Sequence, residues 1–157
     1  MIKRILGAAL VLAAVWGLPR LSHPAVDIGK LEPVEAVRLT AMENGIRVET
    51  DTGAKGMGRT LEEAVADLRK GTAGEVFLET ADKLLISGDL TEFWNEIFAL
   101  FRPACQVYLT EDEVDLNEAA EYLDTHPSGQ TLGRLRGGLG ELPVLKMQEG
   151  RGQLVTK

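Results

Sequence analysis

The first hydrophobic pattern of the chain is an apolar run from Ile5 to Leu18, directly after Lys3 and Arg4. The run has 14 residues, fewer than the roughly 20 that span a bilayer, and a basic start before an apolar run is typical of an export leader. No clean small-x-small cleavage site follows, since Ala14-Val15-Trp16 fails at its last position. We therefore expect residues 1–20 to be a signal peptide or signal anchor, with retention as an anchor favoured and the bulk of the chain extracytoplasmic.

The pattern after the leader predicts one domain. Residues 21–33 contain prolines and a glycine without a period of 2 or 3.6, which indicates a linker out of the membrane. Regular patterns begin at residue 34 and continue to residue 136, a usual size for one hydrophobic core. We expect residues 137–157 to form a C-terminal tail or a small hairpin around Glu149-Gly150-Arg151-Gly152.

Alternation of apolar and polar residues predicts the strands. Residues 34–42 alternate with one polar face, and Asn44-Gly45 is a strong hairpin turn signal before a returning strand over 46–50. Residues 51–59 are expected to form a glycine-rich loop. Short apolar runs predict further strands over 76–78, 84–86, 106–109, 143–147 and 153–155.

Helical periodicity and capping residues predict the helices. The first begins at Thr60, which forms a Thr-x-x-Glu capping box with Glu63, and it ends at Lys70 with Gly71 as a left-handed cap. A second helix is expected over 89–101. Shorter helical patterns follow Asp115 and cover 132–135.

The order of these elements predicts an α+β fold, with about three helices packed on one face of a mixed or antiparallel sheet. The helix over 89–101 is rich in aromatic residues and is expected to supply much of the core. We expect Trp94, Ile97 and Phe98 to be buried there.

Charge and cysteine content restrict the function. The formal net charge is −7, which excludes binding to nucleic acid through phosphates. Cys105 is the only cysteine, so no internal disulfide can form, and its apolar segment predicts a small buried side chain.

The segment from Gly53 to Thr60 suggests a phosphate-binding loop, because glycines before a helix N-terminus can expose N–H groups to an anion. The spacing does not fit a P-loop, since Arg59 stands where the lysine is required and the upstream glycine is misplaced. We interpret this segment as a surface loop.

The histidines and serines do not form a catalytic or metal-binding pattern. His23 and His126 have no second ligand at zinc spacing, and we interpret His126 as a helix-end or loop residue. Ser22, Ser87 and Ser128 lack the Gly-x-Ser-x-Gly motif of a nucleophile elbow.

Acidic pairs such as Asp112 with Asp115, or Glu62 with Glu63, are expected by chance among 24 acids. A sugar site built on such a pair would need aromatic residues around it, and these are 5% of the chain. We therefore predict no catalytic, cofactor-binding or metal-binding residue and no cofactor.

One stretch of the chain resembles a known family. Residues 58–68, with the sequence Gly-Arg-Thr-Leu-Glu-Glu-Ala-Val-Ala-Asp-Leu, are followed by Lys-Leu-Leu-Ile-Ser-Gly-Asp-Leu over 83–90, then by a helix and a strand. This pattern resembles the N-terminal domain of the Ger(x)C family, the C subunits of germinant receptors in endospore-forming bacteria, and the likeness covers about residues 34–136. The chain departs from the family in lacking the lipidated cysteine after the leader and the later domains.

The resemblance implies a non-enzymatic, membrane-associated subunit that acts in sporulation or spore germination. Our leading hypothesis is a membrane-tethered extracytoplasmic module that engages in a protein–protein interaction with another membrane protein. The alternatives are a secreted protein that binds a small ligand, and a small exported hydrolase that uses an Asp/Glu pair.

Overall fold

The computed structural model describes residues 31–110, 113–148 and 151–155. The predicted leader and residues 21–30 of the predicted linker lie outside the described residues. The last three residues of that linker form a strand. The strands are β1 (Leu31–Pro33), β2 (Ala36–Met42), β3 (Gly45–Thr50), β4 (Lys55–Gly58), β5 (Glu75–Phe77), β6 (Lys83–Ser87), β7 (Gln106–Thr110), β8 (Val144–Gln148) and β9 (Arg151–Val155). The helices are α2 (Leu61–Lys70), α3 (Trp94–Leu100), α4 (Leu116–Thr125) and α5 (Leu132–Arg136), with short 3₁₀ turns at Leu78–Thr80 and Thr91–Phe93.

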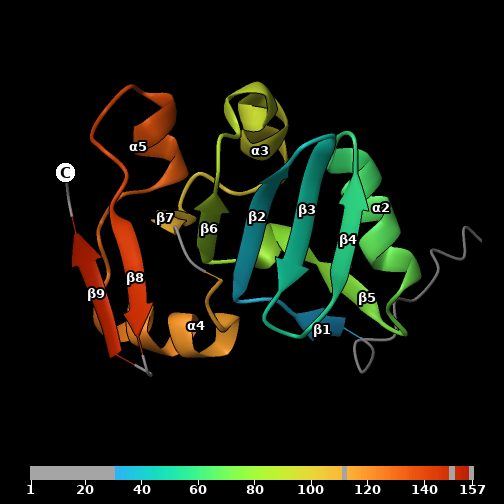
Figure 1. The fold of residues 1–157 in the computed structure, drawn as a ribbon, viewed down its shortest axis with the longest axis horizontal. Helices are drawn as coiled ribbons and strands as arrows, with labels where there is room; N and C mark the ends of the chain where they lie inside the picture. The colour runs from blue at the N-terminus through green and yellow to red at the C-terminus, as the bar shows by residue number, and fades with distance from the viewer. Residues whose placement is uncertain (1–30, 111–112, 149–150, 156–157) are drawn as a thin grey trace, which may run out of the picture.

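The fold is α+β, as expected, and its main sheet is mixed. Seven strands follow the order β4-β3-β2-β6-β7-β8-β9, which can be traced from right to left in Figure 1. The central strands β2, β6, β7 and β8 are parallel to one another, and antiparallel strands extend the sheet on each side, β3 and β4 next to β2 and β9 next to β8. The parallel centre follows from the helical connections, because parallel neighbours need a crossover. The strands β1 and β5 form a separate two-stranded parallel sheet.

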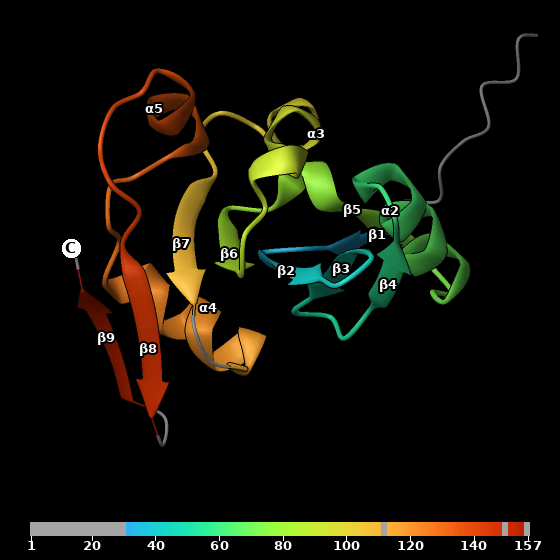
Figure 2. The same ribbon diagram turned by 45° about the horizontal axis from the view of Figure 1, so that its top comes forward.

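Helices cover both faces of the sheet, so the prediction of helices on one face was wrong. Figure 2 shows α3 and α5 above the strands and α4 below them. A large core cluster joins α2, α3 and α5 to one face, and a smaller cluster around Tyr108 and Leu85 joins α4 to the other. The apolar faces of the helices were predictable. The sheet face that each one covers was not, because both faces of β6 and β7 are apolar.

The predicted hairpin of β2 and β3 is confirmed, but its two loop residues are Glu43 and Asn44, and Gly45, at a φ of 142°, pairs with Met42 as the first residue of β3. The predicted loop over 51–59 is wrong in its second half, where Lys55–Gly58 forms β4 against β3. Gly56 has no space for a side chain, since an added Cβ would lie 2.2 Å from the Ala64 carbonyl oxygen. The glycines that suggested a loop therefore allow α2 to pack closely on β4.

The first helix begins as predicted, because the Glu63 N–H donates to the Thr60 hydroxyl at 3.1 Å. The Glu63 carboxylate accepts from the N–H of Arg59 at 2.9 Å, one residue before the helix cap. The predicted left-handed cap at Gly71 is wrong, since its φ is −82°. The Gly71 N–H instead closes a tight last turn on the Leu68 carbonyl oxygen at 3.1 Å.

The second predicted helix is shorter than residues 89–101, and α3 begins only at Trp94 after a 3₁₀ turn. Ile97 is fully buried as predicted. Trp94 and Phe98 are only partly buried and stack on each other at 5.4 Å between ring centroids. The apolar arc of this short helix is wider than the surface that the sheet can cover.

The C-terminal segment forms the expected hairpin of β8 and β9, and this hairpin extends the main sheet through parallel pairing of β8 with β7. Among the described residues, none of the helices is both long and apolar enough to cross a membrane.

Candidate functional site

A distinctive surface of the domain is a part of the sheet, on β2, β3 and β4, that none of the described helices covers. We call it the open face; it lies on β2, β3 and β4, on the side away from α2 (Figure 1). The strand register places alternate residues on this side, because Thr40 pairs with Arg47 and Arg47 pairs with Met57. The open face is formed by Thr40, Met42, Arg47, Lys55 and Met57.

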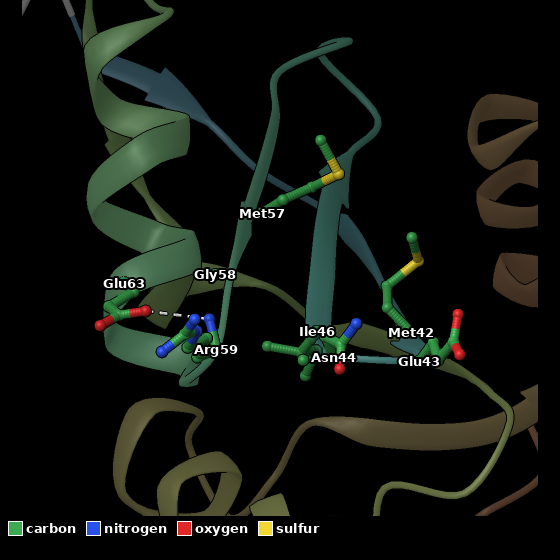
Figure 3. A pocket seen from close by; sticks show the side chains of 9 residues that line it. Met42, Glu43, Asn44, Ile46, Met57, Gly58, Arg59 and Glu63 are labelled. Carbon is green, nitrogen blue, oxygen red and sulfur yellow. Dashed lines mark hydrogen bonds between the residues drawn. The ribbon is translucent and has the colours of Figure 1, made fainter.

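Two methionines dominate the open face. Met42 is 40% exposed and Met57 is 57% exposed, and their side chains project from β2 and β4 on either side of β3 (Figure 3). Both line an open depression of about 640 Å³ at the hairpin end of these strands. Gly45 and Gly58 also line it and contribute no side chain. Exposed methionines on a hollow surface are typical of protein-binding sites, because the flexible thioether adapts to different partners.

The charge of the open face differs from that of the whole chain, which is acidic. Arg47 lies between Thr40 and Met57 in the register, and it has no ion pair with the residues that the structure describes. Arg59 lies at the edge of the depression, close to Glu63 (Figure 3). The surface can therefore contact apolar side chains and a carboxylate together.

A buried ion pair supports the open face at the end of β2 and β3 that lies away from their hairpin. Arg38 on β2 donates from Nε and Nη2 to Glu49 Oε2, at 2.8 Å and 2.5 Å. Its Nη1 donates to the carbonyl oxygen of Val114 at 2.7 Å, so it also holds the loop before α4. Lys55 approaches the second oxygen of Glu49 at 2.8 Å. Arg38 and Glu49 are 6% and 3% exposed.

This network keeps Glu49 ionised. Burial by itself raises the pKa of Glu49, but hydrogen bonds from Lys55 and Arg38 outweigh it and leave the pKa below its ordinary value of 4.5. The two cations bind opposite oxygens of one carboxylate and fix β2, β3 and β4 relative to one another. We interpret this cluster as the support of the open face, because its charges are already paired.

Two backbone N–H groups of the glycine-rich segment bind carboxylates of α2. The N–H of Met57 donates to Asp67 Oδ2 at 3.1 Å, and the N–H of Arg59 donates to the Glu63 carboxylate. Two of the N–H groups that a phosphate would need already bind carboxylates, which would repel it.

The other residues weighed from the sequence lie apart from one another. His126 ends α4 and stacks on Tyr122 at 4.4 Å between ring centroids, as a helix-end residue. Ser128 accepts from the Gln130 N–H at 3.1 Å, and Ser87 ends β6. Asp115 caps α4 by accepting from two N–H groups. The remaining candidates, Ser22, His23 and Asp112, lie outside the described residues.

Glu62 lies in the first turn of α2 beside the capping residue Glu63. Within the described part of the chain, no three acidic, histidine or cysteine side chains are placed to hold a metal ion. Cys105 is fully buried, as expected. Burial, with a smaller contribution from Asp82, raises the pKa of its thiol to about 12, so it is protonated and unreactive at neutral pH.

Comparisons with known proteins return no match: no family model fits the chain, and no curated protein or solved structure is significantly similar to it.

Sequence reasoning missed the open face. The alternation over residues 34–42 indicated one polar face of a strand, but Met42 and Met57 are 15 residues apart in the sequence, and Met57 was assigned to a loop. The alternation of Lys55, Met57 and Arg59 with glycines is the signal that could have indicated a strand.

Proposed function

We propose that this chain is a membrane-tethered extracytoplasmic interaction module that binds another membrane protein through the open face. The proposal combines the basic and apolar leader pattern of residues 1–20 with the surface chemistry of β2, β3 and β4. No catalytic step is part of it.

The observation that carries the proposal is the pair of exposed methionines beside Arg47. Their side chains project from strands that the Arg38–Glu49 pair holds in place, so this surface is organised before a partner arrives. A preorganised surface loses less conformational entropy on binding.

The chemistry of the open face indicates the kind of partner segment. Met42 and Met57 favour apolar side chains, and Arg47 favours a carboxylate between them. We expect an extracytoplasmic segment of the partner that carries apolar residues next to an acidic one. Such binding would weaken as salt rises, because Arg47 is only partly buried.

The resemblance of residues 34–136 to the N-terminal domain of the Ger(x)C family supports a role in sporulation or spore germination. That role is part of the proposal, and a test is the position of the gene. Neighbouring sporulation or germination genes would support it, and a neighbourhood of metabolic genes would count against it.

The first experiment separates tethering from secretion. The full chain is produced in a bacterial host, and membrane and soluble fractions are compared. We expect the chain in the membrane fraction with its leader intact. A soluble form that begins near residue 18 would contradict the tether and favour a secreted binding protein.

The second experiment tests the open face. The full chain is purified from membranes of its native host with its bound partners, as wild type and as the variants Met57→Glu and Arg47→Glu. Each variant adds a negative charge that repels the acidic partner segment, so we expect loss of the partner. The matched control is Lys70→Glu at the exposed last residue of α2, which changes the charge by the same two units as Arg47→Glu and should retain the partner. Equal recovery from all four proteins would contradict the open face as the binding site.

A further inference from the structure

The two outer edges of the seven-stranded sheet differ in their protection. The β4 edge is covered, because α2 packs on it and Asp67 accepts the outward N–H of Met57 at 3.1 Å. On the β9 edge, none of the described residues pairs with the outer side of the strand. Edge strands are normally protected by proline, bulges, inward charges or a covering element. The residues of β9, Arg-Gly-Gln-Leu-Val, provide no proline and no inward charge.

The hydrogen-bond pattern shows which groups of β9 face outward. The Leu109 N–H donates to the Pro143 carbonyl oxygen at 2.8 Å, so the odd-numbered positions of β8 face β7. The even-numbered positions, such as Lys146, therefore face β9, where Gln153 is the register partner. It follows that Gly152 and Leu154 direct their N–H and C=O groups away from the sheet.

We propose that a second copy of this chain adds to β9 in antiparallel orientation, around a two-fold axis at Gln153. In this register Gly152 pairs with the partner subunit's Leu154, and Leu154 pairs with the partner subunit's Gly152. The two outward N–H groups and the two outward C=O groups of each β9 then all form hydrogen bonds across the interface. Gln153 then lies opposite the partner subunit's Gln153. The two seven-stranded sheets become one continuous sheet.

The side chains of β9 suit this self-pairing. Arg151, the only charged residue of β9, lies opposite the partner subunit's Val155, so the Arg151 side chains of the two copies do not face each other. Gly152 has no side chain, and the ring of Tyr122 lies directly over it, since an added Cβ would be 2.5 Å from that ring. The partner subunit's half-buried Leu154 would fill the space beside this ring.

The charge at this edge is small. The described residues of β8 and β9 carry two cations, Lys146 and Arg151, and no acidic side chain, although the chain carries a net charge of −7. In the proposed register neither cation lies opposite its own copy, so two copies approach here with less repulsion than at their acidic surfaces. A strand of five residues buries little area, so we expect weak association that tethering of both copies in one membrane strengthens.

The pairing leaves the open face accessible, because β4 and β9 are opposite edges of the sheet. The dimer would therefore present two partner sites, one on each copy.

Disulfide trapping tests the register directly. Gln153 is a non-hydrogen-bonded position across the new interface, where Cα atoms lie about 4.5 Å apart, within the range for a disulfide. The full chain with Gln153→Cys is oxidised in membranes and analysed on a non-reducing gel. The native Cys105 is fully buried and does not compete. We expect a linked dimer as the main species.

The matched control is Gln148→Cys, an exposed position on the same side of the sheet but on β8. It should remain monomeric under the same oxidation. Equal cross-linking of both variants would indicate random collision, and absence of a dimer with Gln153→Cys would exclude this register. Either result overturns the proposal.

A charge exchange provides a second readout that does not depend on oxidation. Gln153→Glu and Gln153→Lys each place like charges opposite one another in the dimer, so each variant alone should lose association in the membrane, measured by energy transfer between labelled copies. A mixture of the two variants should recover it, because opposite charges then meet. The fold tolerates both variants, since Gln153 is exposed. Failure of the mixture to recover association would contradict pairing at Gln153.

Discussion

Replacing Arg38 by methionine removes the centre of the network below the open face. Arg38 makes two hydrogen bonds to Glu49 and one to the Val114 carbonyl oxygen, and it is 6% exposed. Breaking a buried ion pair costs about 3–5 kcal/mol when an unpaired charge remains. Here Lys55 still binds Glu49 at 2.8 Å, which lowers the cost. The Val114 carbonyl oxygen loses its hydrogen-bond donor, which raises the cost of the substitution. We therefore expect a loss of about 3–4 kcal/mol in the free energy of unfolding.

The assay is urea unfolding of residues 31–157, followed by tryptophan fluorescence. The double variant Arg38→Met with Glu49→Leu should recover the part of the loss that comes from the unpaired Glu49 charge, because no charge remains buried, while the Val114 carbonyl oxygen stays without its donor. The control Lys55→Met should cost less than about 1 kcal/mol, since the side chain of Lys55 is 65% exposed. A cost below about 1 kcal/mol for Arg38→Met alone would refute the role of the pair in holding the strands.

Three further predictions follow from the same packing. Gly56→Ala should destabilise the domain by about 1–3 kcal/mol in urea unfolding, because the new methyl group meets α2, whereas Gly71→Ala, with φ −82°, should be tolerated. Trp94→Ala should cost less than the roughly 3–5 kcal/mol of a fully buried tryptophan, because Trp94 is partly exposed; a larger loss would show that it belongs to the core. Acid should weaken the fold as pH falls from about 4.5 through the lowered folded pKa of Glu49. Glu49→Gln should flatten that part of the stability–pH curve, and an unchanged slope would show that other groups control it.

The sequence predicted the elements better than their arrangement. Local signals were sufficient for the existence of the hairpin near Asn44, the Thr60 cap and the Asp115 cap, because each depends on residues within a few positions. The parallel pairing of β7 with β8 joins segments more than 30 residues apart. Nothing in either segment specifies the neighbour of the other.

The sequence alone did not show whether a glycine lies in a flexible loop or at a close contact between two elements. Gly56 and Gly58 suggested flexibility before a helix, but in the fold they remove side chains where α2 touches β4. The open face was hidden for the same reason, since its second methionine lies between these glycines. Burial of Trp94 was overestimated, because helical periodicity shows which residues share a face and not how far the sheet extends beneath it.

The most direct test of the central claim is site-specific photo-cross-linking in intact membranes. A photoreactive amino acid replaces Met57 on the open face in one full-length protein and the exposed Glu121 on α4 in another. We predict one discrete product with a membrane protein from position 57 and none from position 121, and the Arg47→Glu change should abolish the product at position 57. Products of the same pattern from both positions, or none from position 57, would contradict binding through the open face.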